Sequence, residues 1–132
     1  MAYFLAKTDP DTYSLLDFQK EGETLWDGVH NNAAMLFIQK MIPGDMVFMY
    51  ESLSTKAIVG LATVTGTPFL NTADPRRSWA VTMKFVKAYQ NPLTLATMKA
   101  DDRLKDFQLI RQSRLSVMPV EERYVAIIES YL

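Results

Sequence analysis

The stretch PGDMVFMYESLSTKAIVGLATV, residues 43–64, carries the clearest structural signal in this 132-residue chain. Pro43-Gly44-Asp45 is typical of a turn, and it leads into Met46–Tyr50, a continuous apolar run expected of a buried strand. Ala57–Val64 predicts another strand, in which Gly60 indicates a bulge or a close approach to neighbouring backbone. This segment therefore predicts two strands of a core.

Further strands are predicted on both sides of that segment. Tyr3–Ala6 is a short apolar stretch expected in the core. Trp79–Phe85 alternates apolar and polar residues with a period of two, as in a half-buried strand, and favours a core position for Trp79. Leu115–Met118 is expected to be a short strand ended by Pro119.

Two helices are predicted between the first strands. Ser14 followed by Asp17 fits a capping box that opens a short helix, with Leu15 and Phe18 turned inward. The second helix is expected over residues 32–41, with Asn31 as its N-cap. Its inward face is expected to hold Ala34, Phe37, Ile38 and Met41.

A last helix is predicted at the end of the chain. Acidic side chains are favoured in a first helical turn by the helix dipole, and Glu121 and Glu122 lie there. One face of this helix is expected to be apolar. It comprises Val120, Tyr124, Ile127, Ile128 and Tyr131. Separate strands with helices at the margins indicate an α+β fold, with the strands closing into a small barrel.

The composition is that of an ordinary globular domain, with 48% apolar and 22% charged residues. The absence of cysteine excludes disulfides and thiolate chemistry. No apolar run reaches membrane-spanning length and no signal pattern opens the chain, so a cytoplasmic location is expected. The net charge of −1 argues against a protein that coats phosphates broadly.

The charge is nevertheless uneven along the chain. Residues 1–60 hold four lysines and eight acidic residues, whereas residues 61–132 hold ten basic and seven acidic residues. The second part could therefore carry a nucleic-acid face. The basic residues that would supply its phosphate attraction are Arg76, Arg77, Lys84, Lys87, Arg111 and Arg114.

No catalytic or metal-binding set is evident. His30 is the only histidine, no nucleophile elbow accompanies it, and no glycine-rich phosphate loop is present. We therefore expect a protein that is not an enzyme and that needs no metal or cofactor. Trp26 sits between polar residues and beside Gly28, outside any predicted regular element. It is either a core-packing side chain or one wall of a slot for stacking a base.

Several segments resemble the motifs of EVE domains, in the order in which that family carries them. Lys7-Thr8-Asp9-Pro10 followed by Tyr13-Ser14 resembles the family's K-[ST]-[ED]-P-x-x-Y-S opening. Trp26-Asp27-Gly28-Val29 is similar to W-[DE]-G-V, and the segment 41–45 to M-x-x-G-D. Tyr50-x-Ser52, the strand around Gly60 and the segment 113–120 complete the series.

The resemblance implies that residues 1–132 form a single, complete EVE domain. Its fold would be a PUA-like pseudobarrel of about five to six mostly antiparallel strands with flanking helices, related to YTH and ASCH domains. It also implies a non-catalytic module that captures a flipped or single-stranded, modified nucleobase of DNA or RNA in an aromatic pocket. The ligand-binding residues then expected are Lys7, Thr8, Trp26, Asp27, Gly28, Val29, Asn31, Tyr50, Ser52, Arg114 and Ser116.

The chain departs from the family pattern close to these motifs. His30 and Met35 replace two arginines, Asn32 replaces an aromatic residue, and Glu51 replaces a histidine. These changes are expected to remove positive charge from the pocket mouth and to weaken phosphate contacts there. Two alternatives therefore remain, a binder of a free nucleoside or other small planar ligand and a protein-interaction module with a decayed pocket.

The helix over residues 32–41 is apolar nearly all round. Leu36 lies opposite the expected core face, with Met35 on a flank. Such a patch is expected either to contact a partner, including a second copy in a homodimer, or to be covered by the loop 71–77.

Overall fold

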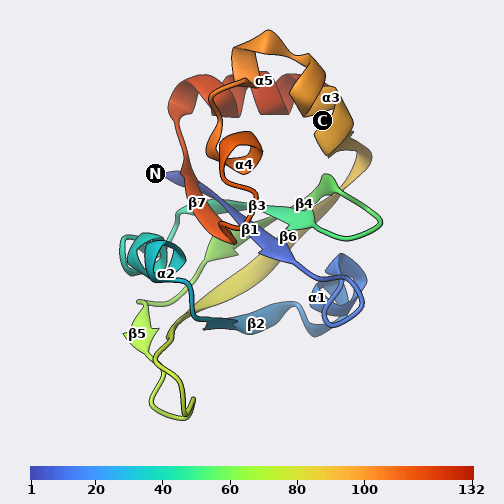
Figure 1. Cartoon of the computed structure of the whole chain (residues 1–132). Coiled ribbons are helices and arrows are strands. Elements are labelled where there is room, and N and C mark those ends of the chain that lie inside the picture. Colours follow the sequence, from blue (N-terminus) through green and yellow to red (C-terminus); the bar gives the residue numbers. More distant parts are fainter.

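The computed structural model describes residues 1–132 and centres on one curled sheet with helices at its margins (Figure 1). The strands are β1 (Tyr3–Thr8), β2 (Glu23–Val29), β3 (Met46–Glu51), β4 (Ala57–Val64), β5 (Phe69–Leu70), β6 (Trp79–Thr94) and β7 (Val117–Val120). The helices are α1 (Leu15–Glu21), α2 (Asn32–Gln39), α3 (Leu95–Ala100), α4 (Gln108–Arg111) and α5 (Glu122–Tyr131), with a short 3₁₀ turn η1 (Asp102–Leu104). Figure 1 shows α3, α4 and α5 gathered on one side of the sheet.

The strand order is β2-β6-β4-β3-β1-β7, and β5 pairs with the start of β6. β1 and β3 run parallel, and the other five pairings are antiparallel. The α+β pseudobarrel with mostly antiparallel strands is therefore confirmed, with seven strands in place of five to six. β2 and β7 end the sheet without pairing to each other, and α2 packs against both β7 and β6. The barrel thus keeps an open seam between β2 and the β1–β7 side.

The segment 43–64 forms two neighbouring strands of the core, as its sequence predicts. These two strands and β1 have hydrogen-bonded neighbours on both sides, and we call them the closed part of the barrel. β3 and β4 pair with each other, and all of their residues except Met46, Glu51 and Thr63 are buried. Gly60 lies at an irregularity in the pairing of β4 with β6. A Cβ on Gly60 would lie 2.6 Å from Leu15 Cδ1 and 2.9 Å from the Lys87 carbonyl oxygen. The predicted close approach to backbone is confirmed.

Both predicted helix starts are present. Ser14 and Asp17 form the reciprocal capping box of α1, and the Asn31 side chain accepts a hydrogen bond from the Ala34 amide at the start of α2. The first amide of α1, that of Leu15, donates to Glu51 at 2.8 Å. A carboxylate at a helix N-terminus is favoured by the dipole, so Glu51 ties α1 to the end of β3.

Several predicted boundaries are wrong. β6 continues to Thr94 instead of ending at Phe85, and α2 ends at Gln39 instead of Met41. The last strand spans residues 117–120 and includes Pro119, which was expected to end it. Proline is tolerated because β7 is an edge strand, where one side needs no backbone donor. In α5 the buried residues are Tyr124, Val125 and Ile128, whereas Tyr131 is 37% exposed.

Trp26 lies inside a strand, contrary to the expectation of a loop position. It belongs to β2 and pairs with Val81 of β6, after which the register shifts before Val29 meets Trp79. Polar residues around Trp26 hide this strand in the sequence, because β2 is an edge strand with a largely exposed side. Trp79 is half-buried and packs against the core, and its Nε1 is buried without a hydrogen-bond partner.

The expected Met35–Leu36 patch is only half present. Met35 is 5% exposed and part of the core, whereas Leu36 is 58% exposed. Met35 is buried because α2 is covered on two sides, by β7 and by β6 of the same chain. The predicted partner contact through Met35 is therefore wrong, and of the two residues only Leu36 is exposed.

Candidate functional site

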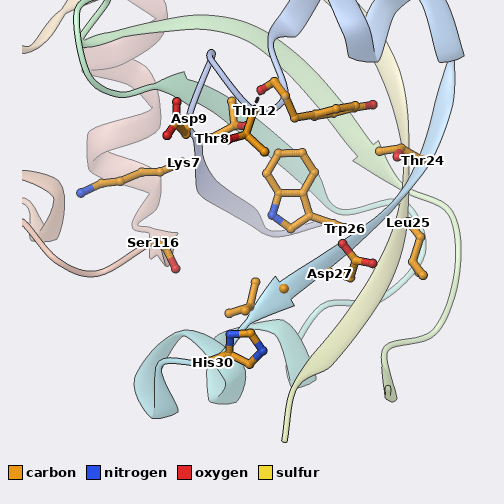
Figure 2. Close-up of a pocket in the computed structure, with 13 residues that line it drawn as sticks. Lys7, Thr8, Asp9, Thr12, Thr24, Leu25, Trp26, Asp27, His30 and Ser116 are labelled. Atoms are coloured by element: carbon orange, nitrogen blue, oxygen red, sulfur yellow. Dashed lines mark hydrogen bonds between the residues drawn. The ribbon is translucent and has the colours of Figure 1, made fainter. Parts of the chain in front are cut away.

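A cavity of about 570 Å³ opens at the seam of the barrel, between β1 and β2 (Figure 2). This volume lies within the usual range of small-molecule sites. Its lining comprises Lys7, Thr8, Asp9, Thr12, Tyr13, Thr24, Leu25, Trp26, Asp27, Gly28, Val29, His30 and Ser116. We call this cavity the seam pocket. It exists because the two strands that flank it are not hydrogen-bonded to each other.

The β1 side of the seam pocket is held by a network around Thr8. The Thr8 carbonyl accepts hydrogen bonds from the Ser52 amide at 2.9 Å and the Ser52 hydroxyl at 3.1 Å. The Thr8 hydroxyl donates to the Tyr13 carbonyl, which fixes the loop that follows β1. Ser52 therefore supports the pocket from behind and does not line it.

Lys7 forms the rim on the same side. Its ammonium donates to the Ser113 carbonyl at 2.8 Å and lies 5.9 Å from the centre of the Tyr50 ring. Burial lowers the pKa of Lys7 and raises the pKa of Tyr50. Figure 2 shows the Lys7 side chain extending away from Trp26, toward the segment that carries Ser116. Lys7 thus joins the pocket to residues 113–116.

The β2 side presents Trp26, Asp27 and Gly28 where the pairing with β6 becomes irregular. Gly28 has φ +72°, a left-handed conformation that favours glycine, and a Cβ there would meet no atom within 4 Å. The backbone geometry and not crowding therefore selects glycine at this position. The irregularity turns Asp27 toward the opening, where Figure 2 shows its carboxylate beside Trp26.

An aromatic cluster backs the pocket. Trp26 is 8% exposed, and its ring centroid lies 6.2 Å from that of Tyr13 and 6.3 Å from that of Phe18. The Tyr13 hydroxyl is buried without a hydrogen-bond partner in the chain. Burial, together with the nearby negative charge of Glu21, raises the pKa of Tyr13 to about 12. Trp26 is therefore both a core side chain and a pocket wall, which joins the two alternatives left open by the sequence.

His30 closes the lower end of the pocket in Figure 2. Its Nε2 lies 2.7 Å from Oδ2 of Asp74, in the loop between β5 and β6. Asp74 also accepts hydrogen bonds from the Arg76 amide and the Ser78 hydroxyl. These bonds, that of the Arg76 amide first, lower the pKa of Asp74 to about 2. The loop is thereby fastened to the end of β2.

A second hollow, of about 370 Å³, adjoins the seam pocket. Its lining includes Asn31 at the start of α2 together with Arg111, Ser113 and Arg114. Sequence neighbours line the two hollows, with His30 and Ser116 in the seam pocket and Asn31 and Leu115 in the second hollow. Arg111 lies 3.7 Å from Asp106, whereas Arg114 has no ion pair and is exposed. We call this hollow the arginine hollow.

The structure brings together seven of the eleven residues expected to bind ligand. The seam pocket contains Lys7, Thr8, Trp26, Asp27, Gly28, Val29 and Ser116. Asn31 and Arg114 line the arginine hollow instead, while Tyr50 is 4% exposed in the core and Ser52 bonds to Thr8.

Six lining residues were not expected. They are Asp9, Thr12, Tyr13, Thr24, Leu25 and His30. Asp9 and Tyr13 lie within the EVE-like opening motif, which was the available signal for them.

The departures from the family pattern have different structural roles. Only His30 lies at the pocket; Met35 is in the core, and Glu51 caps α1. The expectation that Met35 and Glu51 change the charge of the pocket mouth is therefore wrong. The changed charge at the pocket is confined to His30.

The remaining basic residues of the expected nucleic-acid face lie in the β5–β6 loop and along β6. Arg76 and Arg77 are exposed in the loop that Asp74 fastens to His30. Lys84 and Lys87 lie along β6, with Lys87 5.4 Å from the centre of the Tyr89 ring in a separate hollow. The structure contains no group of three or more side chains able to hold a metal ion. None of its helices combines the length and apolarity needed to cross a membrane.

The sequence model of the EVE-domain family matches residues 2–131 of this chain. The chain belongs to the EVE-domain family. The NMR structure of Rpa0253 from Rhodopseudomonas palustris is 33% identical to this EVE domain, with a TM-score of 0.91. That match covers 99% of this chain and 92% of the other. No curated protein matches the chain.

Two more distant structures share the fold. Human THYN1 protein in complex with DNA containing 5-methylcytosine is 22% identical, with a TM-score of 0.87 over 98% of this chain and 96% of that one. A mutant of ZmASCH from Zymomonas mobilis is 10% identical, with a TM-score of 0.68 over 98% of both chains. The expected relation to the PUA-like folds, including ASCH, is thus confirmed.

Proposed function

We propose that this EVE domain is a non-catalytic module that captures one nucleobase of DNA or RNA, flipped or single-stranded, in the seam pocket. The observation that carries the proposal is the seam pocket itself, where Trp26 forms a wall and Lys7, Thr8, Asp27 and Ser116 supply polar groups. A flipped base needs an aromatic wall, polar groups at its edge and shelter from water. The human relative bound to 5-methylcytosine DNA supports a modified base as the occupant.

The flat face and the edge of such a base would contact different groups of the pocket. Stacking on an aromatic ring contributes about 1–3 kcal/mol per base and requires only a flat surface. The carboxylate of Asp27 can accept a hydrogen bond from an exocyclic amine. A methyl group on the base would be recognised by apolar shape, which typically discriminates by about 1–3 kcal/mol.

The arginine hollow is the place where we propose that a neighbouring phosphate binds. Arg114 is free of an ion pair, and Lys7 contacts Ser113 between the two hollows. Guanidinium groups match phosphate geometry, and backbone amides at a helix start favour anions. Arg76 and Arg77 would then contact more distant phosphates, beyond the His30 end of the pocket.

The proposal is tested by fluorescence anisotropy with single-stranded oligonucleotides that differ at one position, 5-methylcytosine or cytosine. Trp26→Phe should weaken binding of the methylated oligonucleotide, because the smaller ring leaves the wall incomplete. Trp79→Phe is the matched control, since the chain has two tryptophans and Trp79 does not line the pocket. Equal binding by the parent and Trp26→Phe, or no binding of any oligonucleotide by the parent, would reject the proposal.

The phosphate contact is tested separately by salt dependence. Arg114→Gln should reduce the slope of log affinity against log salt by about 1, because one phosphate contact is lost. Lys99→Gln, an exposed charge on α3, is the matched control and should keep the parent slope. An unchanged slope in Arg114→Gln would remove the arginine hollow from the interface.

One observation favours a second candidate, a free nucleoside or another small planar ligand. The pocket lining holds two carboxylates, Asp9 and Asp27, against the single lysine Lys7. A ligand without phosphate loses nothing in such surroundings. This candidate predicts binding of a free nucleoside with an affinity that changes little with salt.

A further inference from the structure

His30 is held from outside the seam pocket by a carboxylate that is itself fixed. Asp74 Oδ2 lies 2.7 Å from His30 Nε2 and 2.8 Å from the Ser78 hydroxyl, and Asp74 Oδ1 accepts from the Arg76 amide at 2.9 Å. Ser78 is fully buried, which fixes one of these partners in turn. The orientation of the imidazole is therefore set by the β5–β6 loop and not by a ligand.

The charge of Asp74 decides which ring nitrogen carries the hydrogen. With a pKa of about 2, Asp74 is ionised at neutral pH and can only accept hydrogen bonds. Nε2 must therefore be the donor, and in a neutral imidazole this leaves a lone pair on Nδ1. No group of the chain bonds to Nδ1, and the ring lines the pocket (Figure 2).

We propose that His30 is a specificity-determining residue, whose Nδ1 accepts a hydrogen bond from the exocyclic amine of the captured base. This inference rests on the proposed function and names its substrate class, which is bases that carry an exocyclic amine ahead of keto bases such as thymine and uracil. Asp74 is the positioning residue, because it acts on the base only through the imidazole.

The other charged groups of the pocket agree with that preference. Asp27 from β2 and Asp9 from the loop after β1 also offer only acceptor oxygens, and Lys7 on β1 is turned to Ser113. A keto oxygen among these acceptors would face lone pairs instead of donors, which disfavours the wrong base. An exocyclic amine supplies donors for these acceptor oxygens.

The first test needs no ligand. His30 is the only histidine, so its two ring nitrogens give an unambiguous ¹⁵N NMR spectrum. The parent should show Nε2 protonated and Nδ1 unprotonated. In Asp74→Asn the new amide can donate to Nε2 and shift the hydrogen to Nδ1, whereas Ser78→Ala removes a bond to the same oxygen and should keep the parent tautomer. A parent with the hydrogen on Nδ1 would overturn the inference and leave the proposed function intact.

The second test measures selectivity with two single-stranded oligonucleotides that differ at one base, 5-methylcytosine or thymine. Both bases carry the methyl group, and they differ in the amine or carbonyl at position 4 and in the hydrogen on N3. The parent should prefer 5-methylcytosine about tenfold at pH 8, a typical effect of one unsatisfied polar group.

Three variants identify the source of that preference. His30→Gln keeps a donor for Asp74 but lacks an acceptor at the Nδ1 position, and should bind the two oligonucleotides about equally. Asp74→Asn should shift the preference toward thymine, and Ser78→Ala should retain the parent preference. The inference is overturned, and the proposed function is not, if the parent binds both oligonucleotides with equal affinity. The same holds if both His30→Gln and Asp74→Asn keep the parent preference. A parent that binds neither oligonucleotide overturns the proposed function as well.

Discussion

The closed part of the barrel and its seam are built from similar strands with different neighbours. β4, β3 and β1 each have hydrogen-bonded strands on both sides, and the core side chains of β3 and β4 are almost fully enclosed. β2 has one paired side only and faces β1 across a cavity of about 570 Å³. The contrast shows how one sheet provides stability where its strands pair and a binding site where they separate.

The largest expected effect compares two aromatic side chains, one from each region. Phe48 in β3 is fully buried, and Phe48→Ala should cost about 3–5 kcal/mol of unfolding free energy. Trp26→Ala should cost less than Phe48→Ala, because Trp26 already borders a cavity, yet it should abolish base binding. Urea unfolding and anisotropy measure the two quantities. If Trp26→Ala lost more stability than Phe48→Ala, Trp26 would be mainly a stabilising core residue, like those of the closed part.

A substitution at Gly60 tests how tightly the closed part is packed. Gly60→Ala should destabilise the protein by about 1–3 kcal/mol, since the new Cβ would lie 2.6 Å from Leu15 Cδ1 and 2.9 Å from the Lys87 carbonyl. Adding Leu15→Ala should not restore stability, because the backbone oxygen remains and a buried contact is lost. Thermal unfolding checks both variants, and a neutral Gly60→Ala would show that this part of the sheet adjusts freely.

A smaller effect is expected at the seam from the cap of α2. Asn31→Ala removes the acceptor for the Ala34 amide and should cost about 1 kcal/mol. Asn31→Asp keeps a capping oxygen and serves as the control. Because Asn31 also lines the arginine hollow, the alanine variant should weaken oligonucleotide binding as well. If both variants were as stable as the parent, the seam helix would not depend on its cap.

The smallest effect concerns the pH dependence of the loop at the seam. The pKa of Asp74 is about 2 in the folded protein, below the ordinary value of 3.8. A depressed carboxyl pKa adds stability that is fully present above about pH 4 and is lost as pH falls through about 2. The difference in melting temperature between the parent and Asp74→Asn should therefore shrink from about pH 5 to about pH 2. A difference that stays constant over this range would contradict the assignment.

The closed part was the more predictable of the two regions. The apolar run of β3, the approach at Gly60 and the caps Ser14 and Asn31 are local signals, and local signals are visible in a sequence. The EVE-like motifs then identified most of the pocket lining. Their order along the chain supplied the fold, which periodicity alone could not specify.

The seam was less predictable because its contacts are long-range. Trp26 lies in an irregular edge strand without alternating burial, and the partner of His30 is 44 residues away. Met35 looked exposed because a helical projection assumes one covered face, whereas α2 is covered by both β7 and β6. Glu51 looked like a pocket charge, but it is used by the start of α1.

The proposed function requires a nucleobase to enter the seam pocket and contact Trp26. The two tryptophans give two indole N–H signals in a ¹⁵N-labelled sample, one at the seam and one at the start of β6. On titration with a single-stranded oligonucleotide containing one 5-methylcytosine, we expect a large shift of the Trp26 signal and of the amide signals of Lys7, Asp27 and His30. The Trp79 signal should move little. Saturable binding that leaves the Trp26 indole and these amides unshifted would show that the nucleobase binds outside the seam pocket.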